Sequence, residues 1–361
     1  MPTNVSPEYK KAEAAYRQAR DPDERLDYLR EMLKTIPKHK GTEHLQADIK
    51  TRIKELTAEL AGPQKGAART EPTHVIRAAG AAQISLIGPP NSGKSLLHAR
   101  LTGSRAESAP YPHTTNAPMP GMLLHNDVQF QLVDLPPVSA DVMVPWLPNA
   151  VQPAHAALLV VDLHEAGCTE HVITISERLA EKRIILSDDW SGRLPGGLIE
   201  GIPEMADDEA TPDTSAPDDK DDEADETLFH TRLPTLLVVS KSDLGIDPDE
   251  VDVLLELVEM RFPTIALSAE TGEGLDRLGA LLRRGLDVVR IYTKVPGKPP
   301  DMERPFTVFK GDTVADVARL IHRGKARDLR FAKVWGSGKF DGQQVGVDYL
   351  IDDGDILELH M

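Results

Sequence analysis

Cysteine is nearly absent from this chain. Cys168 is the only one among 361 residues, so no intrachain disulfide can form, and we expect a buried or bystander thiol in a cytoplasmic protein. Aromatic residues make up only 4% of the sequence against 40% hydrophobic residues, so the core must be mostly aliphatic. No apolar run approaches the roughly 20 residues needed to cross a bilayer, and residues 1–26 lack the apolar stretch of a signal peptide.

Positive charge is also scarce. The formal net charge is −17, and a uniformly acidic surface repels nucleic acid, so any RNA contact needs a local basic patch. Much of the acidity lies in residues 203–226, "PEMADDEATPDTSAPDDKDDEADE", which contain almost no apolar side chains. Such a segment cannot bury enough surface to offset its ordering entropy, and we expect a solvated, disordered insertion.

The remaining sequence divides into three parts and a linker. Residues 1–62 carry amphipathic helical patterns, which fit either a helical hairpin or a contact arm for a partner, and residues 63–80 form a linker by composition. Residues 81–295 alternate short apolar strands with amphipathic helices, which predicts an α/β domain with a mostly parallel sheet. Residues 304–361 combine one helix, opened by a Thr313/Asp316 capping box, with several strands, which is a β-grasp pattern.

One short stretch, "IGPPNSGKS" at residues 87–95, fits the phosphate-binding pattern G-x-x-x-x-G-K-[ST]. It follows an apolar strand and precedes a helix, so its backbone N–H groups can surround an anion. We expect Lys94 to reach the β- and γ-phosphates and the Ser95 hydroxyl to bind Mg²⁺. The candidate nucleotide-binding residues of this loop are Gly88, Asn91, Ser92, Gly93, Lys94, Ser95 and Leu96.

Later strands end in residues that select a purine. "LVDLP" places Asp134 where a P-loop protein holds its Mg²⁺-associated carboxylate, and we expect Asp134 to hold the metal through a water. "VVSKSD" supplies Ser240, Lys241 and Asp243, and a carboxylate there accepts hydrogen bonds from guanine but finds no such donor pair on adenine. "ALSAETGEG" adds Ser268 and Ala269. This order predicts a GTPase, with a P-loop ATPase as the alternative.

These motifs together resemble the Obg/DRG-like P-loop GTPases that carry a C-terminal TGS domain. The residues that carry the resemblance are "GPPNSGKSLLHARLTG", "YPHTTNAPMPG", "VDLP", "SKSD" and "SAETGEG", with residues 290–360 similar to the TGS domain. The resemblance implies a Ras-like G domain, Mg²⁺-dependent GTP binding, slow hydrolysis and partners on the ribosome. It also implies that Thr115, in the Pro-rich loop 108–121, is a Mg²⁺ ligand beside Ser95 and, with Lys94 and Asp134, a catalytic residue.

Three residues depart from the family pattern. Pro137 replaces the glycine whose N–H normally meets the γ-phosphate, and since proline has no N–H we expect weakened or absent hydrolysis. Ser240 replaces the usual asparagine, so we expect weaker affinity with specificity kept by Asp243. Asn91 lies where cation-dependent GTPases hold K⁺, although an asparagine here can also simply satisfy a turn.

A basic patch in the C-terminal module is the candidate RNA contact, with a solvated helix face as the alternative. Its members are Arg319, Arg323, Lys325, Arg327, Arg330 and Lys333. Phe331 and Trp335 alternate with apolar residues on a strand, and we expect them in the core. Three functions remain open at this point: a GTPase switch in translation, a non-hydrolysing sensor of GTP, GDP or an alarmone, and an RNA-binding scaffold with a vestigial nucleotide site.

Overall fold

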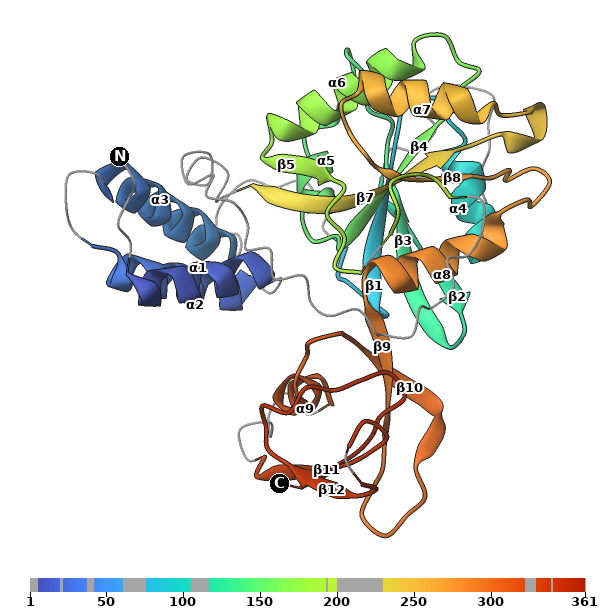
Figure 1. Cartoon of the computed structure of the whole chain (residues 1–361). Coiled ribbons are helices and arrows are strands. Elements are labelled where there is room, and N and C mark those ends of the chain that lie inside the picture. Colours follow the sequence, from blue (N-terminus) through green and yellow to red (C-terminus); the bar gives the residue numbers. More distant parts are fainter. Residues whose placement is uncertain are drawn as a thin grey trace. The chain divides into compact units, whose positions relative to one another are not determined.

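The structure is a computed structural model that describes residues 6–19, 22–37, 42–60, 76–104, 117–192, 194–199, 230–321, 329–338 and 340–360. The chain divides into two compact units, one formed by residues 1–73 with 205–230 and the other by residues 74–204 with 231–361. Figure 1 shows the elements of both units. Within the described residues, no helix is both long and apolar enough to span a membrane.

Helices build the described part of the first unit, and they number three rather than the two of a hairpin: α1 (Pro7–Gln18), α2 (Pro22–Thr35) and α3 (Glu43–Leu60). Ser6 caps α1 by accepting a hydrogen bond from the Tyr9 N–H at 3.1 Å. The apolar stripes of the three helices meet in a separate core made by Tyr9, Tyr16, Leu29, Met32 and Ile49, among others. The sequence indicates the α2 and α3 stripes, but α1 was not distinguished as a helix of its own.

The five strands predicted for the α/β domain are present, namely β1 (Ala82–Ile87), β3 (Val128–Asp134), β4 (Ala156–Val161), β7 (Thr231–Val239) and β8 (Pro263–Ala266). The sheet order is β2-β3-β1-β4-β7-β8-β6, and β5 pairs with β7. All of these pairings are parallel except that of β2 with β3. The predicted, mostly parallel sheet is therefore confirmed.

Three short or peripheral strands were not predicted: β2 (Met119–His125), β5 (Ile184–Ser187) and β6 (Gly197–Leu198). Strand β2 starts inside the segment that the sequence assigns to a Pro-rich loop. Its proline and glycine argued against a strand, but β2 lies at the edge of the sheet, where both residues are tolerated. This correction matters for the site, since β2 begins directly opposite Asp134 in the β2–β3 pairing.

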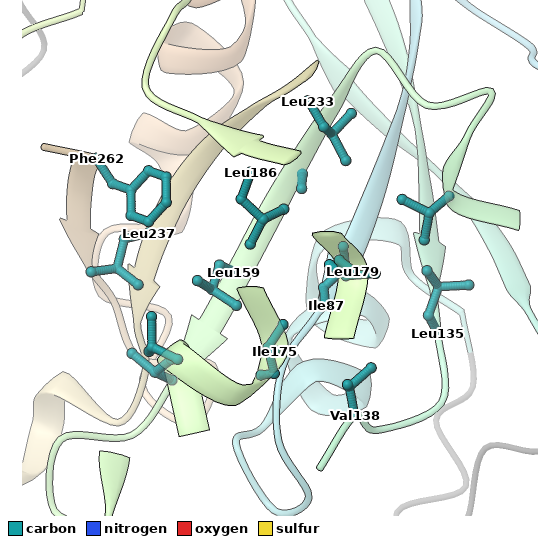
Figure 2. Close-up of a cluster of buried hydrophobic side chains, with 14 of the residues drawn as sticks. Ile87, Leu135, Val138, Leu159, Ile175, Leu179, Leu186, Leu233, Leu237 and Phe262 are labelled. Atoms are coloured by element: carbon teal, nitrogen blue, oxygen red, sulfur yellow. The ribbon is translucent and has the colours of Figure 1, made fainter. Parts of the chain in front are cut away.

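Helices cover both faces of this sheet: α4 (Lys94–Thr102), α5 (Leu147–Val151), α6 (Cys168–Ala180), α7 (Pro248–Leu257) and α8 (Leu275–Gly285). Figure 2 shows the cluster on one face, where Ile87 and Leu159 of the strands meet Ile175 and Leu179 of α6. On the other face Leu86 and Leu158 pack with the residues of α4 and α8. Neighbouring strand residues thus serve opposite cores, which explains why the strands are apolar throughout.

A second sheet forms the C-terminal module, with the order β10-β9-β13-β11-β12. Its elements are β9 (Val288–Thr293), β10 (Asp301–Phe309), α9 (Val314–Ile321), β11 (Phe331–Trp335), β12 (Gln343–Val345) and β13 (Ile356–His360). The capping box is present: the Thr313 N–H donates to Asp316 Oδ2 at 2.8 Å and the Asp316 N–H to Thr313 Oγ1 at 3.4 Å. The predicted β-grasp architecture is confirmed.

Two expectations for this module are wrong. The module begins at β9, inside the segment 81–295 that the sequence assigns to the G domain, because β9 pairs with β10 and β13. Phe331 and Trp335 do not enter its core. Ala332 and Val334 do, while Phe331 and Trp335 lie half-buried on the opposite face of β11, where Phe331 stacks on His360 and Lys294 lies over Trp335.

Candidate nucleotide-binding site

The phosphate loop connects β1 to α4, and its glycines are required by the backbone. A Cβ on Gly88 would lie 2.2 Å from the carbonyl oxygen of Val160, which no side chain tolerates. Gly93, the N-cap of α4, has φ +87°, a left-handed conformation that favours glycine. Asn91 is also left-handed, with φ 59°, and its side chain is exposed. The first turn of α4 thus begins at the loop, as an anion-binding loop requires.

Lys94 is folded into this loop. Its Nζ donates to the carbonyl oxygens of Pro89 at 2.6 Å and Gly88 at 3.0 Å, and lies 3.3 Å from Ser92 Oγ. Burial lowers the pKa of Lys94 to about 8, although the charges of Asp134 and Glu165 act in the opposite direction. A buried ammonium held mainly by neutral carbonyls would be strongly stabilised by an anion, so the loop is electrostatically suited to phosphate.

Ser95 and Asp134 form the candidate metal position. Ser95 Oγ donates to Asp134 Oδ2 at 2.6 Å, and Asp134 ends β3 with 1% of its surface exposed. A hydroxyl and a carboxylate are hard oxygen ligands of the kind Mg²⁺ prefers, and such a site relies on phosphate oxygens for further ligands. Among the described residues, no group of three or more His, Cys, Asp or Glu is arranged to hold a metal ion. Leu96, next in the chain, is half-buried against the α4 core.

The base-selecting loop follows β7 and is tied to the phosphate loop. Ser240 Oγ lies 2.8 Å from the carbonyl oxygen of Ser92 and 2.9 Å from that of Val161. The serine that replaces the family's asparagine therefore still reaches the phosphate loop. The loop then passes through Lys241, which is left-handed with φ 60°, and into a 3₁₀ turn at Ser242–Leu244.

Asp243 and Ser268 meet although they are far apart in the sequence. Ser268 Oγ donates to Asp243 Oδ1 at 2.5 Å and accepts the Thr271 N–H at 3.1 Å. Asp243 is exposed, whereas Ser268 is buried and Ala269 is 7% exposed. The structure thus joins the loops after β7 and β8 and leaves one carboxylate open to a ligand.

Residues 136–139, which follow Leu135, offer no unbonded N–H group to a ligand in this conformation. Pro136 and Pro137 have none, the Val138 N–H donates to the carbonyl oxygen of Gly88 at 3.1 Å, and the Ser139 N–H donates to that of Val142 at 2.9 Å. Leu135 and Val138 are fully buried in the core of Figure 2. The replacement of glycine by Pro137 therefore coincides with a switch segment that packs against the phosphate loop.

One residue of the site was not predicted. Asp162, directly after β4, has 6% of its side chain exposed, and its Oδ2 lies 2.6 Å from Lys241 Nζ. Asp162 follows an apolar strand, as Asp134 ends one, and this signal could have identified it. It was missed because Asp162 belongs to none of the nucleotide-binding motifs.

Several predicted residues are not brought to the site or lie outside the described residues. Thr115, Arg323, Lys325 and Arg327 belong to the latter group, as does the insertion 203–226. Arg319 pairs with Asp316 at 3.0 Å and Lys333 lies 3.9 Å from Glu358, while Arg330 is exposed. The described members of the basic patch are thus partly neutralised. Burial raises the pKa of the Cys168 thiol to about 11, as expected of a bystander.

Comparison with known proteins agrees with this geometry. Residues 83–187 match the family described as 50S ribosome-binding GTPase, and residues 289–361 match the TGS domain. Fold and site therefore define a P-loop GTPase domain followed by a TGS domain. Over most of its length the chain is similar to the developmentally regulated GTP-binding proteins, so the resemblance to Obg/DRG-like GTPases with a C-terminal TGS domain is confirmed.

Individual relatives are distant but nearly collinear with the chain. An uncharacterized GTP-binding protein of Methanocaldococcus jannaschii is 27% identical over 365 residues, covering 93% of this chain and 92% of that protein. Developmentally-regulated GTP-binding protein 2 of Homo sapiens is 25% identical over 366 residues, covering 93% and 98%. Among solved structures, the YchF GTPase of Schizosaccharomyces pombe is 13% identical and covers 79% of this chain and 99% of that one, with a TM-score of 0.49.

Proposed function

We propose that the protein binds GTP and GDP with Mg²⁺, hydrolyses GTP slowly, and acts as a nucleotide-dependent switch that associates with the ribosome or RNA in the cytoplasm. The observation that carries the proposal is the convergence of three loops. Ser240 links the base loop to the phosphate loop at Ser92, and Ser268 links the base loop to the loop after β8 through Asp243. A phosphate-binding end and a purine-binding end are thereby held in one site.

Each residue has a chemical role in this proposal. Lys94 and the first turn of α4 bind the phosphates, while Asp243 accepts the guanine donors and Ser268 with Ala269 lines the base. Ser95 and Asp134 would hold Mg²⁺, Asp134 through a water, and Thr115 would complete the ligands by analogy with the family pattern. Bound Mg²⁺ would neutralise charge on the phosphate oxygens.

A partner role rests on different support. The family matched by residues 83–187 is described as ribosome-binding, and the TGS domain carries the basic residues Arg319, Arg323, Lys325, Arg327, Arg330 and Lys333. In an otherwise acidic protein, we infer that RNA phosphates would be contacted through these cations.

A second function is favoured by Pro137. Because the segment from Pro136 to Ser139 presents no N–H to a γ-phosphate, the site can hold GTP, GDP or an alarmone without hydrolysing it, and the protein would then be a guanine-nucleotide sensor. The two functions share one binding site and differ only in turnover.

Calorimetric titration with GTP, GDP and ATP in the presence of Mg²⁺ tests the binding step. Phosphate release under multiple turnover, with and without ribosomes, then separates the switch from the sensor. The same assay in KCl and in NaCl tests Asn91: a K⁺ role requires faster turnover in KCl, and equal rates leave Asn91 with the turn role alone.

A further inference from the structure

A second acidic residue ends a strand beside the site, and the proposed function does not use it. Asp134 follows β3 and faces Ser95, whereas Asp162 follows β4 and faces Lys241. We propose that Asp162 is a positioning residue, which holds Lys241 and with it the base-selecting loop in the conformation that retains a guanine nucleotide. The proposal rests on the proposed function, because it concerns the same nucleotide site.

The Asp162 carboxylate is built into the fold. Its Oδ2 accepts from Lys241 Nζ at 2.6 Å, and its Oδ1 accepts from the His164 N–H at 3.0 Å. His164 Nδ1 lies 3.3 Å from the same oxygen. Burial alone would raise the pKa of Asp162, but the hydrogen bonds from Lys241 and His164 outweigh it and hold that pKa below its ordinary value. The carboxylate is therefore charged at physiological pH. The His164 N–H holds one of its oxygens, and Lys241 binds the other.

Lys241 needs such a partner. It is a non-glycine residue with φ 60°, a left-handed conformation that is unfavourable for a residue with a Cβ. The Lys241 side chain is 41% exposed, and its ammonium is held in place by the carboxylate of Asp162. A charge-assisted hydrogen bond to a buried acid is strong enough to do this.

Ser240 makes the contribution of Asp162 larger. A hydroxyl carries one proton, yet Ser240 Oγ lies within hydrogen-bond distance of two carbonyl oxygens, those of Ser92 and Val161. The link to the phosphate loop is therefore shared with a second acceptor. An asparagine, which the family pattern has here, brings two amide N–H donors instead. The pair of Lys241 and Asp162 adds a side-chain tie between the loop and the end of β4, and it compensates for the shorter residue.

The first test uses Asp162→Asn, which keeps the shape of the side chain and removes its charge. Release of a fluorescent GDP analogue, measured by stopped flow, should be about tenfold faster than from the wild type. Asp162→Glu should restore part of the slow release.

Asp189→Asn is the matched control, because Asp189 also pairs with a cation, Arg232, but at 3.6 Å and with both side chains mostly exposed. It should release GDP like the wild type. Release from Asp162→Asn at the wild-type rate would overturn the proposal.

A second test does not depend on nucleotide. Amide hydrogen exchange of the nucleotide-free protein should be faster across residues 240–245 in Asp162→Asn than in the wild type or Asp189→Asn, since the Leu244 and Gly245 N–H groups bond within this turn. Unchanged exchange there would refute the positioning role. The double variant Ser240→Ala with Asp162→Asn should release GDP faster than the product of the two single effects, because the loop then loses both ties.

The outcomes separate the two proposals. A wild-type protein that binds no guanine nucleotide refutes the proposed function, and the hydrogen-exchange result alone then decides whether Asp162 holds the loop. A wild-type protein that binds normally, with Asp162→Asn indistinguishable from it in both tests, refutes the role of Asp162 alone.

Discussion

The Val138 N–H donates to the carbonyl oxygen of Gly88 at 3.1 Å, which joins the segment after Asp134 to the phosphate loop. Pro137, immediately before Val138, cannot donate at all. At Pro137 and Val138 the chain therefore packs against the phosphate loop and has no backbone N–H left for a γ-phosphate. This relationship bears most directly on hydrolysis.

Pro137→Gly should therefore raise the single-turnover rate of GTP hydrolysis, because glycine restores a backbone N–H where negative charge develops. A hydrogen bond to a developing charge is worth roughly tenfold or more in rate. Quench-flow with γ-labelled GTP measures the rate, and GDP affinity should not change. Pro137→Ala is the control, because alanine restores the N–H without the backbone freedom of glycine; acceleration by Pro137→Gly but not by Pro137→Ala would show that chain flexibility, not the donor, is responsible.

Asp243→Asn should weaken GDP binding by about 10- to 100-fold, because an amide cannot accept both guanine donors and a lost charged hydrogen bond costs roughly 1.5–3 kcal/mol. The amide can, however, donate to xanthine, which carries a carbonyl where guanine carries an amine. Titration of both nucleotides checks this, and a variant that binds neither better nor worse than the wild type would contradict the base-selector role of Asp243.

Lys94 should make the stability of the nucleotide-free protein depend on pH. Its folded pKa of about 8 lies below the ordinary value of 10.5, so burying the charged form costs free energy below pH 8, and the cost disappears as pH rises toward 10.5. Relative to Lys94→Met, the wild type should gain up to about 3 kcal/mol of unfolding free energy over this range. Urea unfolding at pH 7, 9 and 10 measures it, and parallel curves for the two proteins would contradict the assignment.

Asp353 ties the G domain to the TGS domain. Its carboxylate lies 2.7 Å from Arg283 of α8 and 3.1 Å from Arg290 of β9. Burial alone would raise the pKa of Asp353, but the bonds from Arg290 and the charge of Arg283 lower it below 3.8. The stabilisation is therefore present above pH 3.8 and lost as pH falls through the lowered pKa.

Asp353→Asn should consequently lower the unfolding free energy at pH 7 by about 1 kcal/mol, a modest value because the pair is partly exposed. The difference from the wild type should shrink as pH falls below 3.8. Chemical unfolding at both pH values measures it, with exposed Asp348→Asn as the control. A loss that persists undiminished at low pH would exclude charge as its source.

The buried strands and the phosphate loop could be predicted from the sequence, whereas the edge strand β2 and the faces of β11 could not. Strand apolarity and the glycine spacing fixed β1, β3, β4, β7 and the phosphate loop, because a buried parallel strand and a left-handed turn each restrict which residues can stand there. Strand β2 was missed because it lies at the sheet edge, where proline and glycine do not reveal it. Alternation on β11 was recognised, but the face that Trp335 occupies depends on the partner strands, which sequence alone does not specify.

The site shows the same division. Ser240, Asp243 and Ser268 were recognisable from their motifs, since each follows an apolar strand. The pair of Asp162 and Lys241 was not, because it joins residues 79 positions apart and belongs to no motif. Contacts of this kind depend on which strands are neighbours, and the β4–β7 pairing is a property of the folded sheet.

The most direct test of the central claim is calorimetric titration of the purified chain with GDP, GTP and ATP in the presence and absence of Mg²⁺. We predict that both guanine nucleotides bind in the micromolar range or tighter, that removal of Mg²⁺ weakens GTP binding most, and that ATP binds at least about 100-fold more weakly, as expected from lost charged hydrogen bonds at Asp243. No binding of guanine nucleotides at millimolar concentration, or equal binding of ATP, would contradict the claim that these loops form a guanine-nucleotide site.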